Sequence, residues 1–152
     1  MAVDRSGRAV AAMRPVQVAS LAVGLWWVAN AIGAVLIDSN LSVGRVHGSG
    51  ELLGVGVTAN GWHALFHLLP AIAGIAAAWR PRAALAYLLL AGALYIVVGG
   101  WGLIAGGASV GVIAVDGAGD LVHLIEGLIV FSAGILMLEL ERRPRGVRRT
   151  SA

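Results

Sequence analysis

Six polar side chains in two short segments have types and spacings that could support chemistry. In chain order they are Asn60, His63, His67, Asp120, His123 and Glu126. The first three are separated by three and four positions, so a helix would place them on one face. Asp120 and His123 would share a face of a second helix, with Glu126 about 60° further round. Such groups can accept hydrogen bonds, bind metal ions or carry protons.

Three interpretations of these residues are open from the sequence. The first is a structural polar cluster without a cofactor, in which Asn60 and Asp120 cap their helices and the histidines bond across a helix interface. The second is a metal site in which the three histidines, with Glu126 or Asp120, bind Zn, Fe or Cu. A bis-histidine haem is a special case of it. The third is a proton or ion relay through histidine and Glu126, because histidine titrates near neutral pH.

The rest of the sequence lacks a recognisable set of catalytic residues. It contains no cysteine, which excludes disulfide scaffolds, thiolate metal sites and cysteine catalysis. It has no phosphate-binding glycine loop, nucleophile elbow or serine–histidine–acid set. We therefore expect a non-enzymatic structural or accessory subunit of a homo-oligomer or larger membrane complex. The alternative is a metal- or haem-binding redox or transport protein that uses the histidine cluster.

The composition indicates that lipid surrounds these segments. Of the 152 residues, 59% are hydrophobic and 12% are charged, and 22 glycines come in addition. A soluble domain is about 45–50% apolar with glycine included and about 25% charged. These values exclude a soluble globular domain, a disordered chain and a nucleic-acid module. They favour an integral membrane protein whose main partner is membrane lipid.

Four apolar runs are long enough to be transmembrane helices. They cover residues 16–37, 61–79, 83–106 and 121–140. A helix needs about 20 residues to cross the hydrocarbon core, and backbone groups in lipid must be bonded within their own segment. We therefore predict an all-α, integral membrane four-helix bundle over residues 16–140. An N-terminal tail, 1–15, and a basic C-terminal tail, 141–152, flank this domain.

Arginine positions predict how the helices are threaded. The chain has 11 arginines and no lysine. With four spans, ten arginines fall in the two tails and the turn at 80–82 on one side, and only Arg45 falls on the other. Because positive residues stay in the cytoplasm, both termini are predicted there. Charged flanks of this kind are ordinary in membrane proteins, so no nucleic-acid partner is expected.

The predicted outer loops, 38–60 and 107–119, are rich in small and polar residues. We expect them to be flexible. His47, Glu51 and Asp116 lie in these loops and are expected to be solvated surface groups. By contrast Asn30 lies in the middle of the first span, where a hydrogen bond to a neighbouring helix is expected.

The two halves of the chain resemble each other. A shift of 60 residues aligns Asn60 with Asp120 and His63 with His123, and a shift of 69 aligns the first span with the third. A repeat of two spans keeps its direction through the membrane. The chain would then consist of two hairpins related as a parallel internal repeat, with an axis along the membrane normal. This axis would bring the two polar faces toward each other.

The segments Asn60-Gly-Trp-His63-Ala-Leu-Phe-His67 and Asp120-Leu-Val-His123-Leu-Ile-Glu-Gly127 resemble the DUF4383 family of bacterial four-span membrane proteins. The resemblance covers about residues 16–140, nearly the whole chain. It implies a four-helix membrane fold and a location in the bacterial cell (inner) membrane. The family carries no established activity. Pro70 and Glu126 depart from the family's pattern, which leaves the role of Glu126 open.

Overall fold

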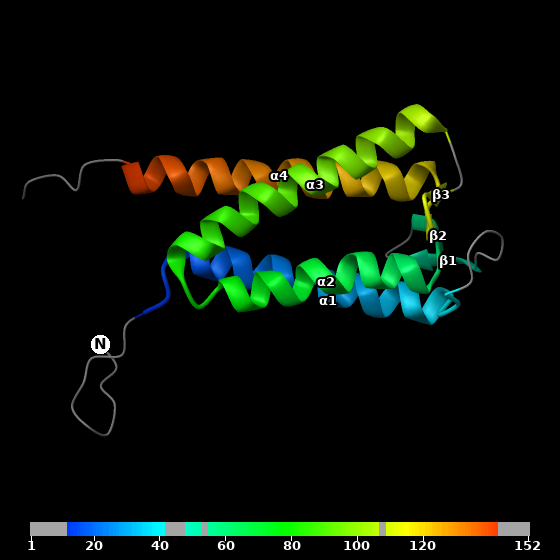
Figure 1. The fold of residues 1–152 in the computed structure, drawn as a ribbon, viewed down its shortest axis with the longest axis horizontal. Helices are drawn as coiled ribbons and strands as arrows, with labels where there is room; N and C mark the ends of the chain where they lie inside the picture. Colours follow the sequence, from blue (N-terminus) through cyan, green and yellow to red (C-terminus); the bar gives the residue numbers. More distant parts are fainter. Residues whose placement is uncertain (1–11, 42–47, 53–54, 107–108, 143–152) are drawn as a thin grey trace, which may run out of the picture.

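A computed structural model of the chain describes residues 12–41, 48–52, 55–106 and 109–142 (Figure 1). The fold is all-α, as predicted, with four helices in this part of the chain. The helices are α1 (Pro15–Ile37), α2 (Gly61–Ala77), α3 (Pro81–Ala105) and α4 (Gly117–Arg142). Each of the two longer connections carries a short hairpin. Its strands are β1 (Gly48–Leu52) and β2 (Val55–Ala59) in the first, and β3 (Ser109–Val110) and β4 (Ile113–Ala114) in the second.

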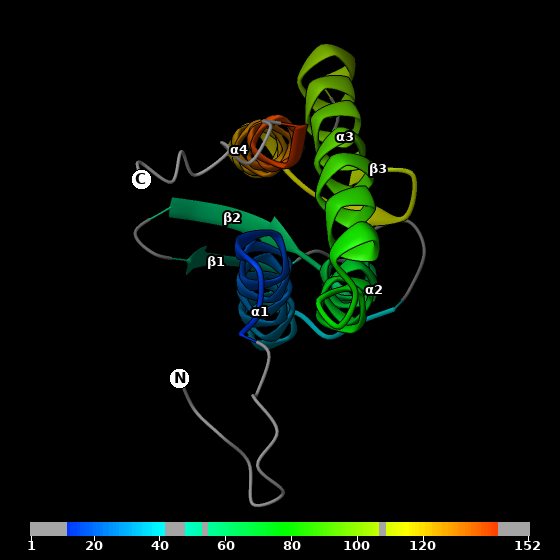
Figure 2. The ribbon, with the colours of Figure 1, turned by 90° about the vertical axis from the view of Figure 1, so that its left-hand side faces the viewer.

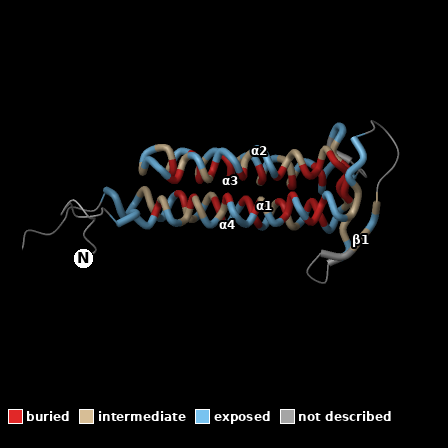
Figure 3. The backbone as a smooth tube through the Cα atoms, turned by 90° about the horizontal axis from the view of Figure 1, so that it is seen from below, coloured by how far each residue is buried: buried red, intermediate tan, exposed pale blue. Residues whose placement is uncertain are grey.

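Helices α1, α3 and α4 are long and apolar enough to cross a membrane. α2 is shorter, with 17 residues, and is apolar as well. At 1.5 Å per residue it extends about 25 Å, slightly less than the roughly 30 Å of a hydrocarbon core. The outward side chains are those of a lipid-facing protein, since Leu36, Trp79 and Ile104 are each more than 80% exposed. Buried positions face inward along every helix (Figure 3).

The helices pack as two hairpins, with α1 along α2 and α3 along α4 (Figures 1 and 2). Polar side chains join the first pair, because Gln17 Nε2 donates to the Ala78 carbonyl at 2.7 Å and Ser20 Oγ donates to the Gly74 carbonyl at 2.8 Å. Glycine lets the second pair approach closely. A Cβ atom at Gly127 would lie 2.8 Å from the Gly92 carbonyl oxygen, so a larger residue there would push the helices apart.

Aromatic side chains fill the space between the α1–α2 pair and the α3–α4 pair. Trp27 of α1 and Tyr95 of α3 are fully buried, and their rings stack with centroids 4.1 Å apart. Leu88 of α3 and Val130 of α4 belong to the same buried cluster. This core lies between the helices that carry the polar residues described below, and Tyr95 packs directly against one of them, His123.

Helix boundaries differ from the predicted spans where a local signal overrides hydropathy. Pro81 is the first residue of α3, as expected for a proline that stops one helix and starts the next. α2 ends at Ala77 rather than residue 79. α4 begins at Gly117, four residues before the predicted start, because Asp116 satisfies the N–H of Gly119 at 2.8 Å.

The two longer connections are more ordered than expected. We predicted loops over 38–60 and 107–119, whereas parts of both form antiparallel hairpins. The reason is tertiary, because Thr58 Oγ1 donates to Asp116 Oδ2 at 2.8 Å and Asn60 Nδ2 donates to the Val112 carbonyl at 2.9 Å. These bonds tie the β1–β2 and β3–β4 hairpins together at one end of the bundle.

The ends of the bundle differ in chemistry. The start of α1, the α2–α3 turn and the end of α4 lie together at one end, and the hairpins lie at the other (Figure 1). The arginines of the first end are Arg14, Arg80, Arg82 and Arg142. Most of both predicted tails, together with Arg45, His47 and the side chain of Glu51, lies outside the described residues.

Candidate functional site

Asn60 fixes the start of α2. Its Oδ1 accepts hydrogen bonds from the backbone N–H of His63 at 2.9 Å and of Ala114 at 3.2 Å. The first bond is the N-terminal cap expected from the sequence. The second, with the bond from Nδ2 to Val112, fastens the β3–β4 hairpin onto the same helix end. Asn60 therefore sets the position of the first turn of α2, on which His63 stands.

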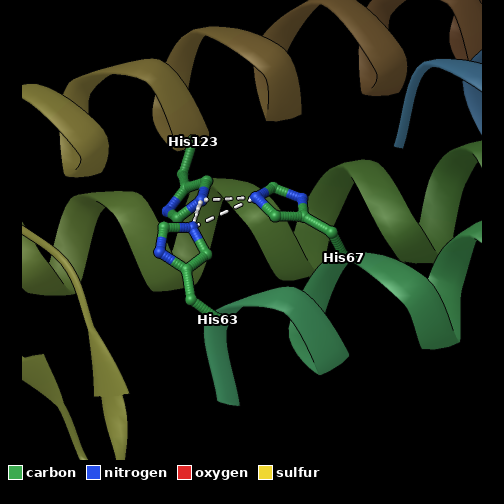
Figure 4. Close-up of side chains that lie close together, drawn as sticks. All are labelled: His63, His67 and His123. Atoms are coloured by element: carbon green, nitrogen blue, oxygen red, sulfur yellow. Dashed lines mark hydrogen bonds between the residues drawn. The ribbon is translucent and has the colours of Figure 1, made fainter. Parts of the chain in front are cut away.

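Three histidines converge immediately inside this cap (Figure 4). The Nε2 atom of His63 lies 3.1 Å from Nε2 of His67 and 3.2 Å from Nε2 of His123. The third edge, between His67 and His123, measures 3.4 Å. All three side chains are buried. Among the described residues they form one group whose nitrogens could hold a metal ion.

The outer nitrogen of His63 determines its tautomer. Nδ1 lies 2.8 Å from the carbonyl oxygen of Ala114 and 3.3 Å from that of Thr58. Carbonyl oxygens only accept hydrogen bonds, so Nδ1 carries the hydrogen. In the neutral ring, Nε2 then carries no hydrogen, and its lone pair points toward the other two histidines.

Tyr95 is a further residue of the site, and it was not predicted from the sequence. Its hydroxyl lies 2.8 Å from Nδ1 of His67, and its ring stacks on Trp27. Phe66 packs against the same group, with its ring centroid 5.7 Å from His67 and 5.4 Å from His123. The signal was weak, since Tyr95 is one of two tyrosines in an apolar span and only the crossing of α3 brings it to the histidines.

Glu126 lies on the same helix as His123 but bonds elsewhere. Its Oε1 accepts from Trp26 Nε1 at 2.6 Å and from Asn30 Nδ2 at 3.2 Å. The interhelical bond expected for Asn30 is thus made to Glu126. The structure brings the three histidines together and directs Glu126 toward α1. Its Oε2 has no partner among the described residues.

Asp120 does not cap α4, contrary to the first interpretation above. It is the fourth residue of that helix, is buried, and packs against Gly102 of α3, where any Cβ would overlap its carboxyl group. Neither of its oxygens has a hydrogen-bond partner in the described part of the chain. Nδ1 of His123, one turn along, is also unpartnered there.

Asp116 takes the capping role instead and is not the free surface charge that we expected. Burial favours its neutral form, but the N–H of Gly119 and the hydroxyl of Thr58 donate to its carboxylate. The balance lowers the pKa of Asp116 below its ordinary value. Asp116 is thus an anionic link between the start of α4 and strand β2.

A small cavity adjoins the histidines on the side of α1. Its volume is about 40 Å³, and all three rings line it. The rest of the wall is Asn30 and small or aliphatic residues, namely Ala34, Ile37, Val57, Ala59, Gly119 and Val122. The rings of Phe66 and Tyr95 pack against His123 and do not line this cavity. The cluster is therefore packed against aromatic rings and also borders a small hollow.

Comparison with known families gives one match. The model of DUF4383, a domain of unknown function, matches residues 17–136. The chain belongs to the DUF4383 family. The matched range contains all four helices almost completely, and with them the three histidines, Asn60 and Asp120. No curated protein and no solved structure matched the chain in the two other comparisons.

Proposed function

We propose that this DUF4383 protein binds a divalent transition-metal ion through His63, His67 and His123, with Zn²⁺ as the best-fitting ion. The observation that carries the proposal is the triangle of Nε2 atoms, whose edges are 3.1, 3.2 and 3.4 Å. In a tetrahedral zinc site with Zn–N bonds of about 2.05 Å, neighbouring nitrogens lie about 3.3 Å apart. The triangle therefore has the size of one face of that tetrahedron.

The surroundings of the triangle also fit a metal site. Histidines that bind metal ordinarily donate their other N–H to a carbonyl, a carboxylate or another oxygen, which fixes the tautomer. His63 makes this bond to Ala114, and Nδ1 of His67 faces the Tyr95 hydroxyl. Two of the three rings thus have an outer oxygen partner on the side away from the triangle.

Hydrogen bonds among the three histidines explain the triangle of Nε2 atoms less well than a bound metal ion does. Each Nε2 can offer either one hydrogen or one lone pair, and Nε2 of His63 offers a lone pair. Because each of the three Nε2 atoms is either a donor or an acceptor, at least two of them are of the same kind. Those two nitrogens face each other without a hydrogen bond between them. A metal ion at the centre would use three lone pairs at once and remove this conflict.

The geometry favours a bare ion over haem. A bis-histidine haem requires a porphyrin between two imidazoles. Here no two of the three Nε2 atoms are more than 3.4 Å apart, and the adjoining cavity has room for only a few atoms. Zn²⁺, Cu²⁺ and Fe²⁺ share a preference for imidazole, and the tetrahedral spacing selects Zn²⁺ among them.

Metal analysis of the purified protein tests the proposal. The protein would be purified in detergent, loaded with Zn²⁺, freed of excess metal and measured by inductively coupled plasma mass spectrometry. We expect about one Zn²⁺ per chain in the wild type and less than about a tenth of that in His63→Ala and His123→Ala. Ile125→Ala, at a lipid-exposed position of α4, is the matched control and should retain the metal. A folded wild type that retains no Zn²⁺ would overturn the proposal.

A second candidate is a non-enzymatic structural or accessory subunit, in which the histidines form a polar plug. The bonds from Asn60 to both α2 and the β3–β4 hairpin favour it, since they secure the outer end of the bundle. On this candidate the purified protein is metal-free, and His63→Ala and His123→Ala still lower its melting temperature. Added Zn²⁺ would then leave the melting temperature of the wild type unchanged.

For location we propose the bacterial cell membrane, with both termini in the cytoplasm. The gathering of the described arginines at the end of the bundle that holds the start of α1 and the end of α4 supports this orientation. It places the histidine triangle near the outer face. Lipid covers the exposed apolar side chains, and a second copy or a larger complex could cover part of them.

A further inference from the structure

We infer that the proposed metal ion keeps its fourth position open to the cavity beside α1, where it binds water or hydroxide and exchanges it for small inorganic anions. The inference rests on the metal site proposed above. Tri-histidine sites with a free position bind water or substrate there, whereas structural zinc sites are closed by four protein ligands. The described residues place three nitrogens at this site and no fourth ligand.

The packing around the histidines determines the direction of the open position. The rings of Phe66 from α2 and Tyr95 from α3 lie against His123, with centroids 5.4 and 5.5 Å away. On the α1 side lies the cavity of about 40 Å³, which the three histidines line. A water molecule needs at least about 10–15 Å³ of such space, so the cavity holds one to about three non-hydrogen atoms.

The polar group on the far wall indicates the class of ligand. Nδ2 of Asn30 is engaged, because it donates to the Trp26 carbonyl and to Glu126 Oε1, each at 3.2 Å. Within the described residues no hydrogen bond is made to its Oδ1. This amide oxygen can accept a hydrogen from a metal-bound water or hydroxide. The remaining wall is apolar, which excludes larger polar ligands.

Cobalt substitution tests this inference separately from the metal site. Co²⁺ bound by three histidines has a visible absorption band that changes when the fourth ligand changes. Azide is the probe, because it has three atoms and replaces metal-bound water. For the wild type we expect a saturable change of the band on azide addition. Ala34→Val adds two carbons to the cavity wall and should bind Co²⁺ equally but weaken the azide response at least about tenfold.

Two further variants complete the experiment. Val122→Leu fills the cavity from α4 and should act like Ala34→Val, which covers the case in which one of them fails to fold. Ala73→Val makes the same change as Ala34→Val at an exposed position of α2 and should respond to azide as the wild type does. Bound Co²⁺ that does not respond to azide, or a response unaffected by both filling variants, would overturn the inference while leaving the metal site intact. Absence of Co²⁺ binding would overturn both.

Discussion

His63 of α2 and His123 of α4 are sixty residues apart in the chain, and their Nε2 atoms lie 3.2 Å apart where the α1–α2 pair meets the α3–α4 pair. A shift of the sequence by 60 residues aligns these two positions with each other. The starts of α2 and α4 are tied to each other's connections, because Asn60 bonds to Val112 between β3 and β4 and Asp116 bonds to Thr58 of β2. The polar centre of the protein is thus assembled from one helix of each helical hairpin, α2 and α4.

Zinc should stabilise the protein through the histidine triangle. At a free Zn²⁺ concentration of 100 times Kd, binding to the folded state alone adds about 2.7 kcal/mol to the free energy of unfolding. The melting temperature in detergent should rise for the wild type and for Ile125→Ala. It should stay unchanged for His123→Ala. A zinc-induced rise of equal size in His123→Ala would show that the ion binds elsewhere.

Asn60 should contribute more than an ordinary helix cap. Asn60→Ala removes the cap of α2 and both bonds to the β3–β4 hairpin, and we expect it to lower the free energy of unfolding by about 2–3 kcal/mol. Asn60→Asp keeps the acceptor oxygen and loses the donor to Val112, so a loss of about 1 kcal/mol is expected. Unfolding by denaturing detergent would measure both. Equal losses in the two variants would mean that the bonds of Oδ1 do not matter.

From the lowered pKa of Asp116 we predict that the protein loses stability at acidic pH. The pKa of Asp116 is lowered in the folded protein, so its stabilising effect is complete above the unfolded pKa of about 3.9 and is lost as the pH falls through the folded pKa. The melting temperature of the wild type should therefore fall, relative to that of Asp116→Asn, as the pH is lowered from about 5 to 3. Asparagine can still cap α4 but does not titrate. Parallel pH profiles of the two proteins would contradict this assignment.

Asp120 should affect metal binding and stability in opposite directions. It is a buried carboxyl group without a partner in the described residues, one turn from His123. Asp120→Asn should raise the melting temperature of the metal-free protein, because burial of a charge is costly. The same change should weaken Zn²⁺ binding about tenfold, since the carboxylate attracts the ion in a low dielectric. Asp116→Asn is the matched control, and an unchanged Kd in Asp120→Asn would refute the prediction.

Reporter fusions should place both termini on the cytoplasmic side. Green fluorescent protein fused to either terminus should fluoresce, and alkaline phosphatase at the same positions should be inactive. Alkaline phosphatase inserted at Gly111, in the turn between β3 and β4, should be active because that turn lies at the opposite end of the bundle. Termini on opposite faces would contradict four crossings, and α2, the shortest of the described helices, would be the first candidate for the one that does not cross.

Helix positions could be predicted because their signal is local. Long apolar runs, Pro81 and the cap at Asn60 act within a few residues of the helices they define. The start of α4 was predicted too late, because hydropathy does not register Asp116, whose effect depends on the backbone N–H of Gly119. The β1–β2 and β3–β4 hairpins were missed for a related reason. They are held by bonds from Thr58 and Asn60 to residues more than 50 positions away.

The sequence alone determined the solvent of this protein, its four helices and the face on which each polar residue stands, because composition and helical period do not depend on distant contacts. Only the tertiary structure decided which of these residues meet. The crossing of the two hairpins joined His63 and His67 to His123, added Tyr95 and turned Glu126 toward α1. These contacts could not be read from the sequence, because they depend on how closely the glycines let the helices approach. They also depend on where the aromatic rings pack between the helices.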